Sequence, residues 1–331
     1  DLVGRQHLDY MQLYRKYTYH EMHSYSLDAI GEYELDERKV AYEGTLDQLY
    51  NQDFYTFIDY NRQDTLLLYK LDTKLKFIDL SNELAHANTV LLPTTMGAVA
   101  VTEQAIINHA HEEGLIVPNR KRNDDEERTK AAGAYVAYPK KGLHDWIGSI
   151  DLNSLYPSVI RALNMTPETI VGQLRPLLTE HALKTKILDG KTFADAWEGE
   201  FGSKEYQAVM NMEPGTEITI DWEAGDSDTC SAADVWRLIF DSNNPWILSA
   251  NGTILTYEKK GIIPGLLERW YAERKELQAK MRDTEGEERA FWDKRQLVKK
   301  INLNSLYGAI LNPGCRFFDK RIGQSTTLTG R

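Results

Sequence analysis

The nine residues Lys300–Gly308, with the sequence KINLNSLYG, constrain the fold of this chain most strongly. Side chains three and four apart share one face of a helix, so a helix here would point Lys300, Asn304, Tyr307 and Gly308 the same way. A lysine on such a face can hold a phosphate, and a Tyr-Gly pair lets a flat base pair lie close to the helix. The segment therefore predicts a nucleotide-holding surface. Taken alone, it also fits an ordinary amphipathic helix with a glycine near its end.

A second informative segment lies about 150 residues earlier, at 146–160. An apolar stretch begins at Trp146 and ends at Asp151, and we expect a helix with Pro157 at its first position. A carboxylate at the end of a strand can hold a metal ion. The backbone N–H groups of residues 153–156 would lie at the helix N-terminus, which favours a polyphosphate. The two segments together predict both halves of a nucleoside triphosphate site.

The sequence DLNSLYPS at 151–158 resembles motif A of the family B DNA polymerases, and the pattern KxxxNSxYG at 300–308 resembles motif B. Both occur in the family's order. Other likenesses cover most of the chain and favour the polymerases of T-even-like bacteriophages. The segment 251–264, with Asn-Gly and then GIIP, is similar to the start of the fingers, and RFFD at 316–319 is similar to the return to the palm.

The pentapeptide at 60–64, YNRQD, is similar to the third motif of the family's proofreading exonuclease. It lies in a predicted helical stretch over 55–80, where Tyr60 and Asp64 share a face. The resemblance implies that Asp64 faces a catalytic metal ion and Tyr60 the attacking water. An ordinary surface aspartate is the alternative. The apolar positions at helical spacing in this stretch are Phe57, Ile58, Leu66, Leu67, Leu71, Leu75 and Ile78.

Several family motifs do not occur in this sequence. Family B catalysis uses an aspartate pair in a YGDTDS motif downstream of motif B, and proofreading uses two motifs upstream of Tyr60. We therefore expect an internal section of a larger or split polymerase. The segment GDSDT at 225–229 superficially resembles the aspartate pair, but it follows WEA rather than an apolar strand. It predicts an exposed acidic turn carrying Asp226 and Asp228.

The resemblance implies an α+β multidomain fragment that contains part of an RNase H-like exonuclease, a palm sheet and helical-hairpin fingers. The expected parts are 1–85, the C-terminal part of the 3′ to 5′ exonuclease; 86–140, a linker and connection to the palm; 141–260, the palm with motif A and an insertion; 261–310, the fingers with motif B; and 311–331, the start of the return to the palm. Tryptophans of the insertion are expected in its core: Trp197, Trp222, Trp236 and Trp246.

The fingers are expected to be a short helical hairpin. Leu266, Trp270, Leu277 and Met281 recur on one face, a turn is expected at 285–288, and a second helix at about 289–307. The resemblance implies that Arg274 on the first helix binds the triphosphate opposite Lys300. Gln278 stands where the family often has another lysine, so that contact could pass to Lys275 or Lys280.

The resemblance implies a two-metal mechanism in which a primer 3′-hydroxyl attacks the α-phosphate of a deoxynucleotide. Two Mg²⁺ ions about 4 Å apart stabilise the entering and leaving oxygens. The second set of ligands for these ions is missing from this sequence. The implied site residues are Asp151, Asp64 and Tyr60 as catalytic groups; Asp151, Leu152 and Asp64 as metal ligands; and Ser154, Leu155, Tyr156, Arg274, Lys300, Asn304, Tyr307 and Gly308 as nucleotide-binding groups. Tyr156 would pack against the sugar and exclude a 2′-hydroxyl.

The charge of the chain is unevenly distributed. The formal net charge is −11, yet residues 259–331 carry 16 Lys and Arg against 9 Asp and Glu. A basic end that coincides with motif B points to a phosphate or nucleic-acid surface, although solvated basic helices would give the same count. Two cysteines imply no disulfide framework, and no apolar run is long enough to span a membrane. We therefore expect a cytoplasmic protein, in the host cytoplasm if the source is viral.

The expected partners are primer-template DNA, deoxynucleoside triphosphates and the remaining polymerase section, with a sliding clamp as a further candidate. Two other function classes stay open. One is a non-catalytic DNA- or nucleotide-binding section of a split polymerase. The other is a stand-alone nuclease, which is disfavoured because one of three exonuclease motifs is present. The segment KAAGAY at 130–135 stands near where family members usually carry a template-contacting Tyr-x-Gly-Gly, so the chain departs from the family pattern here.

Overall fold

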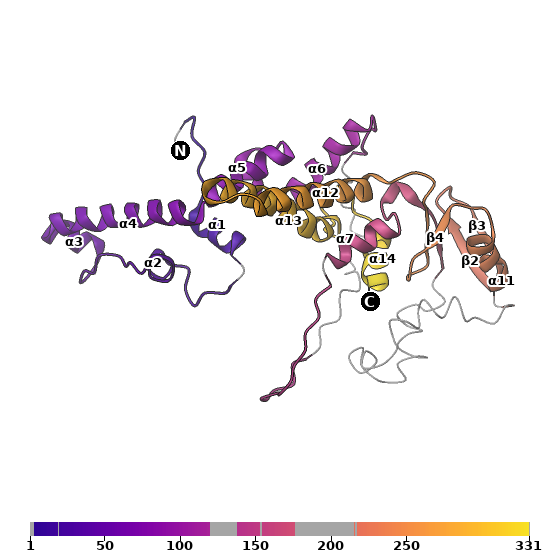
Figure 1. The fold of residues 1–331 in the computed structure, drawn as a ribbon, viewed down its shortest axis with the longest axis horizontal. Coiled ribbons are helices and arrows are strands. Elements are labelled where there is room, and N and C mark those ends of the chain that lie inside the picture. The colour runs from indigo at the N-terminus through magenta and orange to yellow at the C-terminus, as the bar shows by residue number, and fades with distance from the viewer. Residues whose placement is uncertain are drawn as a thin grey trace. The chain divides into compact units, whose positions relative to one another are not determined.

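A computed structural model describes residues 3–18, 20–119, 138–152, 154–175, 215 and 217–330. The chain forms two compact units, residues 1–101 and 102–331 (Figure 1). Helices and an antiparallel sheet are both present, which confirms the α+β class. The expected division into five polymerase parts stays a prediction. The segment 130–135, Asn153 and Trp197 lie outside the described residues.

The described part of the first unit is helical. Its elements are α1 (Tyr10–Tyr17), α2 (Leu27–Leu35), α3 (Leu46–Gln52), α4 (Phe54–Leu75), α5 (Phe77–Asn88) and the 3₁₀ helix η1 (Leu92–Met96). Side chains at the N-caps of α1 to α4 each accept a hydrogen bond from a backbone N–H of the first turn, which satisfies a donor that the helix itself leaves free. These caps are Asp9, Ser26, Thr45 and Asp53. The helix starts are thus encoded locally.

The single helix expected over 55–80 is wrong, because the chain breaks at Lys76 into α4 and α5. Lys76 has a left-handed backbone with φ 58°. Asp72 stabilises this corner, since its Oδ1 accepts hydrogen bonds from the Ile78 N–H (3.2 Å) and the Tyr10 hydroxyl (3.1 Å). The corner then buries Phe77 in an aromatic cluster with residues of α1. Tertiary contacts override the continuous helical pattern here.

The expected apolar stripe of α4 is also only partly buried. Leu67 and Leu71 lie in the core, whereas Ile58 and Leu66 are 47% and 40% exposed. Ile78, beyond the break, is 42% exposed as well. The short helices α2 and α3 pack against α4, but the edges of its apolar stripe remain in contact with solvent.

An acidic side chain is held inside the first unit at Glu34. Its carboxylate accepts a hydrogen bond from the Tyr14 hydroxyl (2.8 Å) and forms an ion pair with Lys74 (2.9 Å). Burial by itself raises the pKa of Glu34, but these hydrogen bonds from Lys74 and Tyr14 outweigh it and leave the pKa below its usual range. The charged form of Glu34 therefore stabilises the folded unit.

The second unit contains a five-stranded antiparallel sheet with the strand order β3-β2-β1-β5-β4. The strands are β1 (Ile170–Leu174), β2 (Glu217–Trp222), β3 (Ser227–Ser231), β4 (Trp246–Leu248) and β5 (Thr253–Thr256). The short helix α11 (Ala232–Trp236) continues into a π-helix, Arg237–Asp241, and packs on β2 and β3. Gly172 of β1 lies opposite Trp222 of β2, and a Cβ at position 172 would lie 3.0 Å from the indole ring. A larger residue at position 172 would push this central strand apart.

The tryptophans of this region differ in burial. Trp222 and Trp246 are partly buried and pack against the apolar cluster of the sheet and α11, as expected. Trp236 is 37% exposed and pairs with Phe240, so the expected core position of Trp236 is wrong. The acidic segment 225–229 is exposed at the β2–β3 turn and the start of β3, which confirms that part of the sequence analysis.

The remaining helices of the second unit are α6 (Ala98–Glu112), which begins in the last residues of the first unit, α7 (Leu155–Ala162), the 3₁₀ helix η3 (Pro167–Thr169), α12 (Ile262–Arg282), α13 (Gly286–Ile310) and α14 (Lys320–Gly330). The helices α12 and α13 form the expected hairpin and pack along each other (Figure 1). The turn expected at 285–288 is wrong in detail, because α13 already begins at Gly286, which has a φ of 60°. A glycine adopts this backbone without strain.

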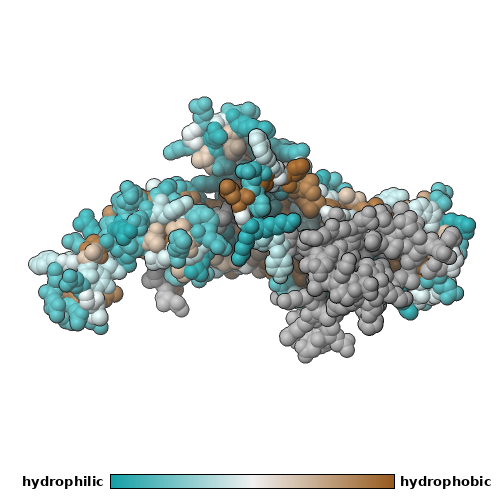
Figure 2. Space-filling view, turned by 90° about the horizontal axis from the view of Figure 1, so that it is seen from below, coloured by the Kyte–Doolittle hydropathy of each residue, from teal (hydrophilic) through white to brown (hydrophobic). Residues whose placement is uncertain are grey.

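Among the described helices, none is both long and apolar enough to cross a lipid bilayer. The described surface in Figure 2 is mainly hydrophilic, with small separate apolar areas.

Candidate functional site

The helical face expected from residues 300–308 is present on α13. Lys300, Asn304, Tyr307 and Gly308 all lie within this helix, at the spacing that puts them on one face. Asn304 and Gly308 are exposed, and apart from the neighbouring backbone of α13 itself, no atom of the described residues lies within 4 Å of where a Cβ of Gly308 would be. The helix therefore presents an open backbone surface beside an amide and a lysine.

The neighbouring helix α12 brings Arg274 to this face. Its Nε donates a hydrogen bond of 3.3 Å to Oε1 of Gln296, which lies one turn before Lys300 on α13. Gln296 in turn donates to Asp293 (2.8 Å). Sequence reasoning missed Gln296, although its spacing of four residues from Lys300 marks the same face. Two cationic residues on neighbouring helices thus belong to one surface.

Lys275 and Lys280 are the candidates for the contact that Gln278 cannot make, and each lies against an aromatic ring. The Nζ of Lys275 is 4.6 Å from the centre of the Tyr271 ring, and that of Lys280 is 4.8 Å from the Trp292 ring. Such cation–π contacts hold an ammonium group in one position.

The segment after Asp151 forms α7, but its start differs from the expectation. The helix begins at Leu155 and not at Pro157, and Ser154 at its N-cap has a left-handed backbone with φ 55°. Pro157 is instead the third helical residue and is buried with Ile160. Pro157 has no N–H to offer, so the first-turn amides near the helix N-terminus are those of Leu155 and Tyr156.

The rings of Tyr156 and Tyr307 bring the two sequence motifs into contact. They stack with centroids 4.3 Å apart and planes inclined by 27°. The Tyr307 hydroxyl lies 3.2 Å from Oγ1 of Thr327 on α14, a partner that the sequence analysis missed. Burial raises the pKa of Tyr307, and the hydrogen bond with Thr327 offsets only part of that rise. The stack joins α7, α13 and, through Thr327, α14.

The strand expected before Asp151 is wrong, since residues 138–152 contain no strand. Asp151 and Leu152 are both exposed, and so are Trp146 and Ile150. A strand needs a neighbour to accept its backbone hydrogen bonds, and no described segment pairs with this one. Within the described residues, no three His, Cys, Asp or Glu side chains are grouped to hold a metal ion.

In the first unit, Tyr60 and Asp64 share a face of α4 as expected, and both meet Lys39. The Lys39 Nζ is 2.8 Å from Oδ2 of Asp64 and 2.6 Å from the Tyr60 hydroxyl. Burial alone lowers the pKa of Lys39, but the contacts with Asp64 and Tyr60 outweigh it and leave the pKa raised. The other oxygen of Asp64, Oδ1, is buried and has no hydrogen-bond partner among the residues that the structure describes. Sequence reasoning missed Lys39, which no local spacing connects to α4.

The family model for DNA polymerase family B matches residues 92–331, which include both motif segments. The DNA-directed DNA polymerase of Escherichia phage RB69 is 32% identical over 174 residues, covering 53% of this chain and 19% of that polymerase. That of Enterobacteria phage T4 is 25% identical over 341 residues, covering 98% of this chain and 36% of that polymerase.

A solved structure of the family B DNA polymerase from the archaeon Pyrobaculum calidifontis has the same fold, with a TM-score of 0.63 at 18% identity. It matches 99% of this chain, which covers 35% of that structure. The chain thus spans between 19% and 36% of the length of these relatives. The resemblance to family B polymerases, with relatives among the T-even-like phages, is confirmed. Because the family model covers well over half of its residues, the chain belongs to DNA polymerase family B.

Proposed function

We propose that this chain supplies the nucleotide-binding half of a template-directed DNA polymerase active site. The reaction would transfer a nucleotidyl group from a deoxynucleoside triphosphate to a primer 3′-hydroxyl, as phage-type DNA replication requires. The observation that carries this proposal is the stack of Tyr156 on Tyr307 at 4.3 Å, because it joins motif A to motif B. Arg274 and Lys300 lie along the same helical hairpin.

Each residue of the site has a role that its position supports. Arg274 and Lys300 would neutralise the triphosphate from two helices, and exposed Asn304 would orient it. The first-turn amides of α7, at Leu155 and Tyr156, would face phosphate oxygens, with Ser154 at the N-cap. The face of Tyr307 and Gly308 would line the nascent base pair, since the space beside Gly308 is open.

Tyr156 would select the sugar of the incoming nucleotide. Its ring is supported by Tyr307 and cannot move in that direction, so it forms a fixed wall. A rigid aromatic wall admits a deoxyribose and clashes with the additional 2′-hydroxyl of a ribose.

Asp151 and Leu152 would contribute to magnesium binding. A carboxylate and a backbone carbonyl are the oxygen ligands that Mg²⁺ uses, and Asp151 is exposed and accessible. One carboxylate is too few for two ions, so the remaining ligands would come from another part of the polymerase. When bound, two Mg²⁺ ions stabilise the entering and leaving oxygens of the transferred phosphate.

Asp64 and Tyr60 would belong to the associated 3′ to 5′ exonuclease. Within the described part of the chain, the buried Oδ1 of Asp64 has no hydrogen-bond partner, which fits a carboxylate that holds a cation there. Lys39 holds the other oxygen and the Tyr60 hydroxyl, and so fixes their positions. Further ligands for this metal ion would again come from outside this sequence.

The remaining polymerase section is the partner that the structure supports best. The irregular segment before Asp151 exposes four large apolar side chains: Leu143, Trp146, Ile147 and Ile150 are each at least 75% exposed. Exposed apolar runs of this kind mark an interface. Primer-template DNA and deoxynucleotides would be the substrates, a sliding clamp is a further candidate partner, and the cytoplasm, of the host if viral, is the proposed location.

Primer extension tests the proposal. We expect no incorporation by the isolated chain with Mg²⁺, and incorporation when a polypeptide with the downstream palm and upstream exonuclease motifs is supplied. Asp151→Asn in that complex should abolish it. A complex that binds DNA and nucleotide with normal affinity yet never extends a primer would favour the alternative, a non-catalytic binding section of a split polymerase.

Extension by the isolated chain that Asp151→Asn abolishes would show that a second carboxylate lies within it. Asp226 and Asp228 would then be the next residues to replace.

A further inference from the structure

The helix α14 lies next to both tyrosines of the motif A and motif B stack. Thr327 lies 3.2 Å from the Tyr307 hydroxyl. A Cβ at Gly330 would lie 3.4 Å from Cε1 and 3.6 Å from Cδ1 of Tyr156, which is ordinary van der Waals contact. The backbone at Gly330 therefore lies beside one edge of the Tyr156 ring, while Tyr307 stacks against the ring. A shift of α14 would therefore change the space at this edge of the Tyr156 ring.

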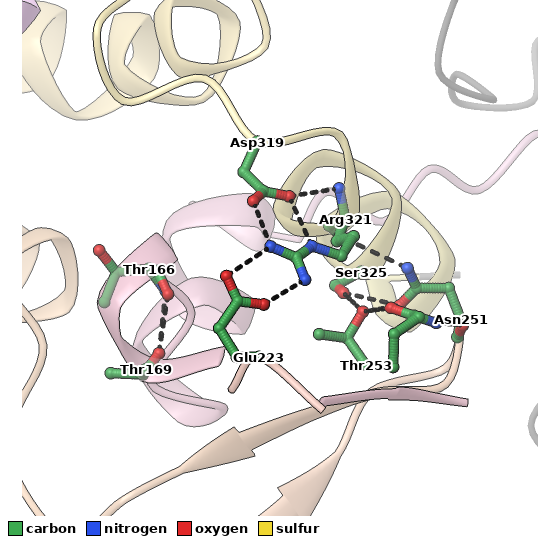
Figure 3. Close-up of polar contacts among 9 residues, drawn as sticks. Thr166, Thr169, Glu223, Asn251, Thr253, Asp319, Arg321 and Ser325 are labelled. Carbon is green, nitrogen blue, oxygen red and sulfur yellow. Dashed lines mark hydrogen bonds and ion pairs between the residues drawn. The ribbon is translucent and has the colours of Figure 1, made fainter. Parts of the chain in front are cut away.

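A turn of the sheet holds α14 through a buried cluster of hydroxyl groups. The Ser325 Oγ lies 2.6 Å from Oδ1 of Asn251 and 3.2 Å from the Thr253 hydroxyl (Figure 3). It also lies 3.0 Å from the Ser249 hydroxyl. Ser249, Thr253 and Ser325 are each at most 1% exposed. Buried polar groups that satisfy one another in this way resist displacement, because separating them would leave each without a partner.

The same turn contacts α14 through two more hydrogen bonds. The Ala250 N–H donates to Oγ1 of Thr329 (3.2 Å), and the side-chain amide of Asn251 donates to the Arg321 carbonyl (3.3 Å). Arg321, Ser325 and Thr329 are spaced by four residues, so one face of α14 carries all three contacts. The side chain of Arg321 also forms ion pairs with Asp319 (2.8 Å) and Glu223 (2.7 Å), as Figure 3 shows.

We infer that the turn at 249–253 positions α14 and, through it, the Tyr156 ring, so that Ser325 and Thr329 are positioning residues for selection of the nucleotide sugar. Neither residue is placed to touch the nucleotide. They act by keeping Gly330 against the ring edge that would otherwise be free to retreat from a 2′-hydroxyl. This inference rests on the proposed function, in which Tyr156 is the wall that faces the sugar.

A substitution pair at Thr329 tests the inference in the full-length polymerase that carries this chain. Thr329→Val keeps the shape but removes the acceptor for the Ala250 N–H, and Thr329→Ser keeps the hydroxyl. The measured quantity is the ratio of kcat/KM for a deoxynucleotide to that for the matching ribonucleotide. We expect Thr329→Val to lower this ratio about three- to tenfold, as the loss of one hydrogen bond allows, and Thr329→Ser to leave it unchanged. The Kd for primer-template DNA should stay the same in both.

A second pair controls for general destabilisation. Ser325→Ala removes the central hydroxyl of the cluster, and Ser81→Ala removes an equally buried hydroxyl in the first unit, where it contacts Tyr17. Only Ser325→Ala should lower the sugar ratio. If Ser81→Ala or Thr329→Ser lowered the sugar ratio equally, the inference would be overturned. The Ser81 hydroxyl contacts Tyr17 of the first unit, and Thr329→Ser keeps the hydroxyl that contacts Ala250.

Tyr156→Ala separates this inference from the proposed function. If Tyr156→Ala relaxes sugar selection while Thr329→Val and Ser325→Ala do not, the positioning role is refuted and the proposed wall stands. If Tyr156→Ala leaves sugar selection unchanged, the proposed wall and the positioning role both fall.

Discussion

Replacing Lys300 by alanine in the full-length polymerase should weaken use of the incoming nucleotide far more than binding of DNA. Lys300 lies on the same face of α13 as Gln296, whose side chain is hydrogen-bonded to Arg274 at 3.3 Å. A lysine there would form a charge-assisted hydrogen bond with the triphosphate. Such a bond is worth about 1.5 to 3 kcal/mol. The expected loss in kcat/KM for a deoxynucleotide is therefore about ten- to a hundredfold.

The adjacent lysine provides a matched control on the same helix. Lys299 points to a different side of α13, where its Nζ forms an ion pair with Glu273 on α12 at 2.5 Å. Lys299→Ala removes the same charge and the same side-chain length, but it breaks a contact inside the hairpin. A pair of this kind contributes up to about 1 kcal/mol to stability. We therefore expect Lys299→Ala to lower the melting temperature slightly and to leave kcat/KM nearly unchanged.

Steady-state kinetics with varied nucleotide, together with a titration of labelled primer-template DNA, separate the two effects. If Lys300→Ala weakened DNA binding and nucleotide use equally, Lys300 would contact the DNA backbone and not the triphosphate. If Lys299→Ala lowered kcat/KM for the deoxynucleotide as much as Lys300→Ala did, the effect would come only from the net charge of the hairpin. Either result would refute the assignment of a specific phosphate contact to the face of α13.

Tyr156→Ala should lower the discrimination against ribonucleotides by about a hundredfold or more, measured by primer extension with each nucleotide type; unchanged selectivity would contradict the role. Glu34→Gln should make the free energy of unfolding depend less steeply on pH in the acid range. The pKa of Glu34 is lowered in the folded state, so its carboxylate stabilises the fold above its ordinary pKa of about 4.3. This contribution is lost as the pH falls through the folded-state pKa. Urea unfolding at several pH values measures this, and an unchanged pH slope would count against it. Gly261→Ala should destabilise the second unit by about 1 to 3 kcal/mol, because its Cβ would collide with the Thr166 methyl group. Gly308→Ala, with open space around it, is the control and should not reduce the unfolding free energy.

The helical hairpin of α12 and α13 could be predicted from the sequence, and so could the face that carries Lys300 and Asn304. Helical spacing and capping depend on residues within a few positions of each other, so a single sequence contains this information. The motif resemblance added the family, which the comparisons confirm. The assigned roles of the site residues stay predictions.

Contacts between distant segments could not be predicted in the same way. Lys39 meets Asp64, Thr327 meets Tyr307, and a turn at 249–253 holds α14, yet no periodic pattern connects these residues. The same limit explains the errors. A strand expected before Asp151 has no partner in the described residues, and a helix expected through Lys76 bends where Phe77 is buried. Sequence by itself determined most of the local helices and the family, because helical spacing, capping and motif patterns each depend on neighbouring residues. Only the tertiary structure decided which side chains meet, because strand pairing, burial and ring stacking each require a partner far away in the chain.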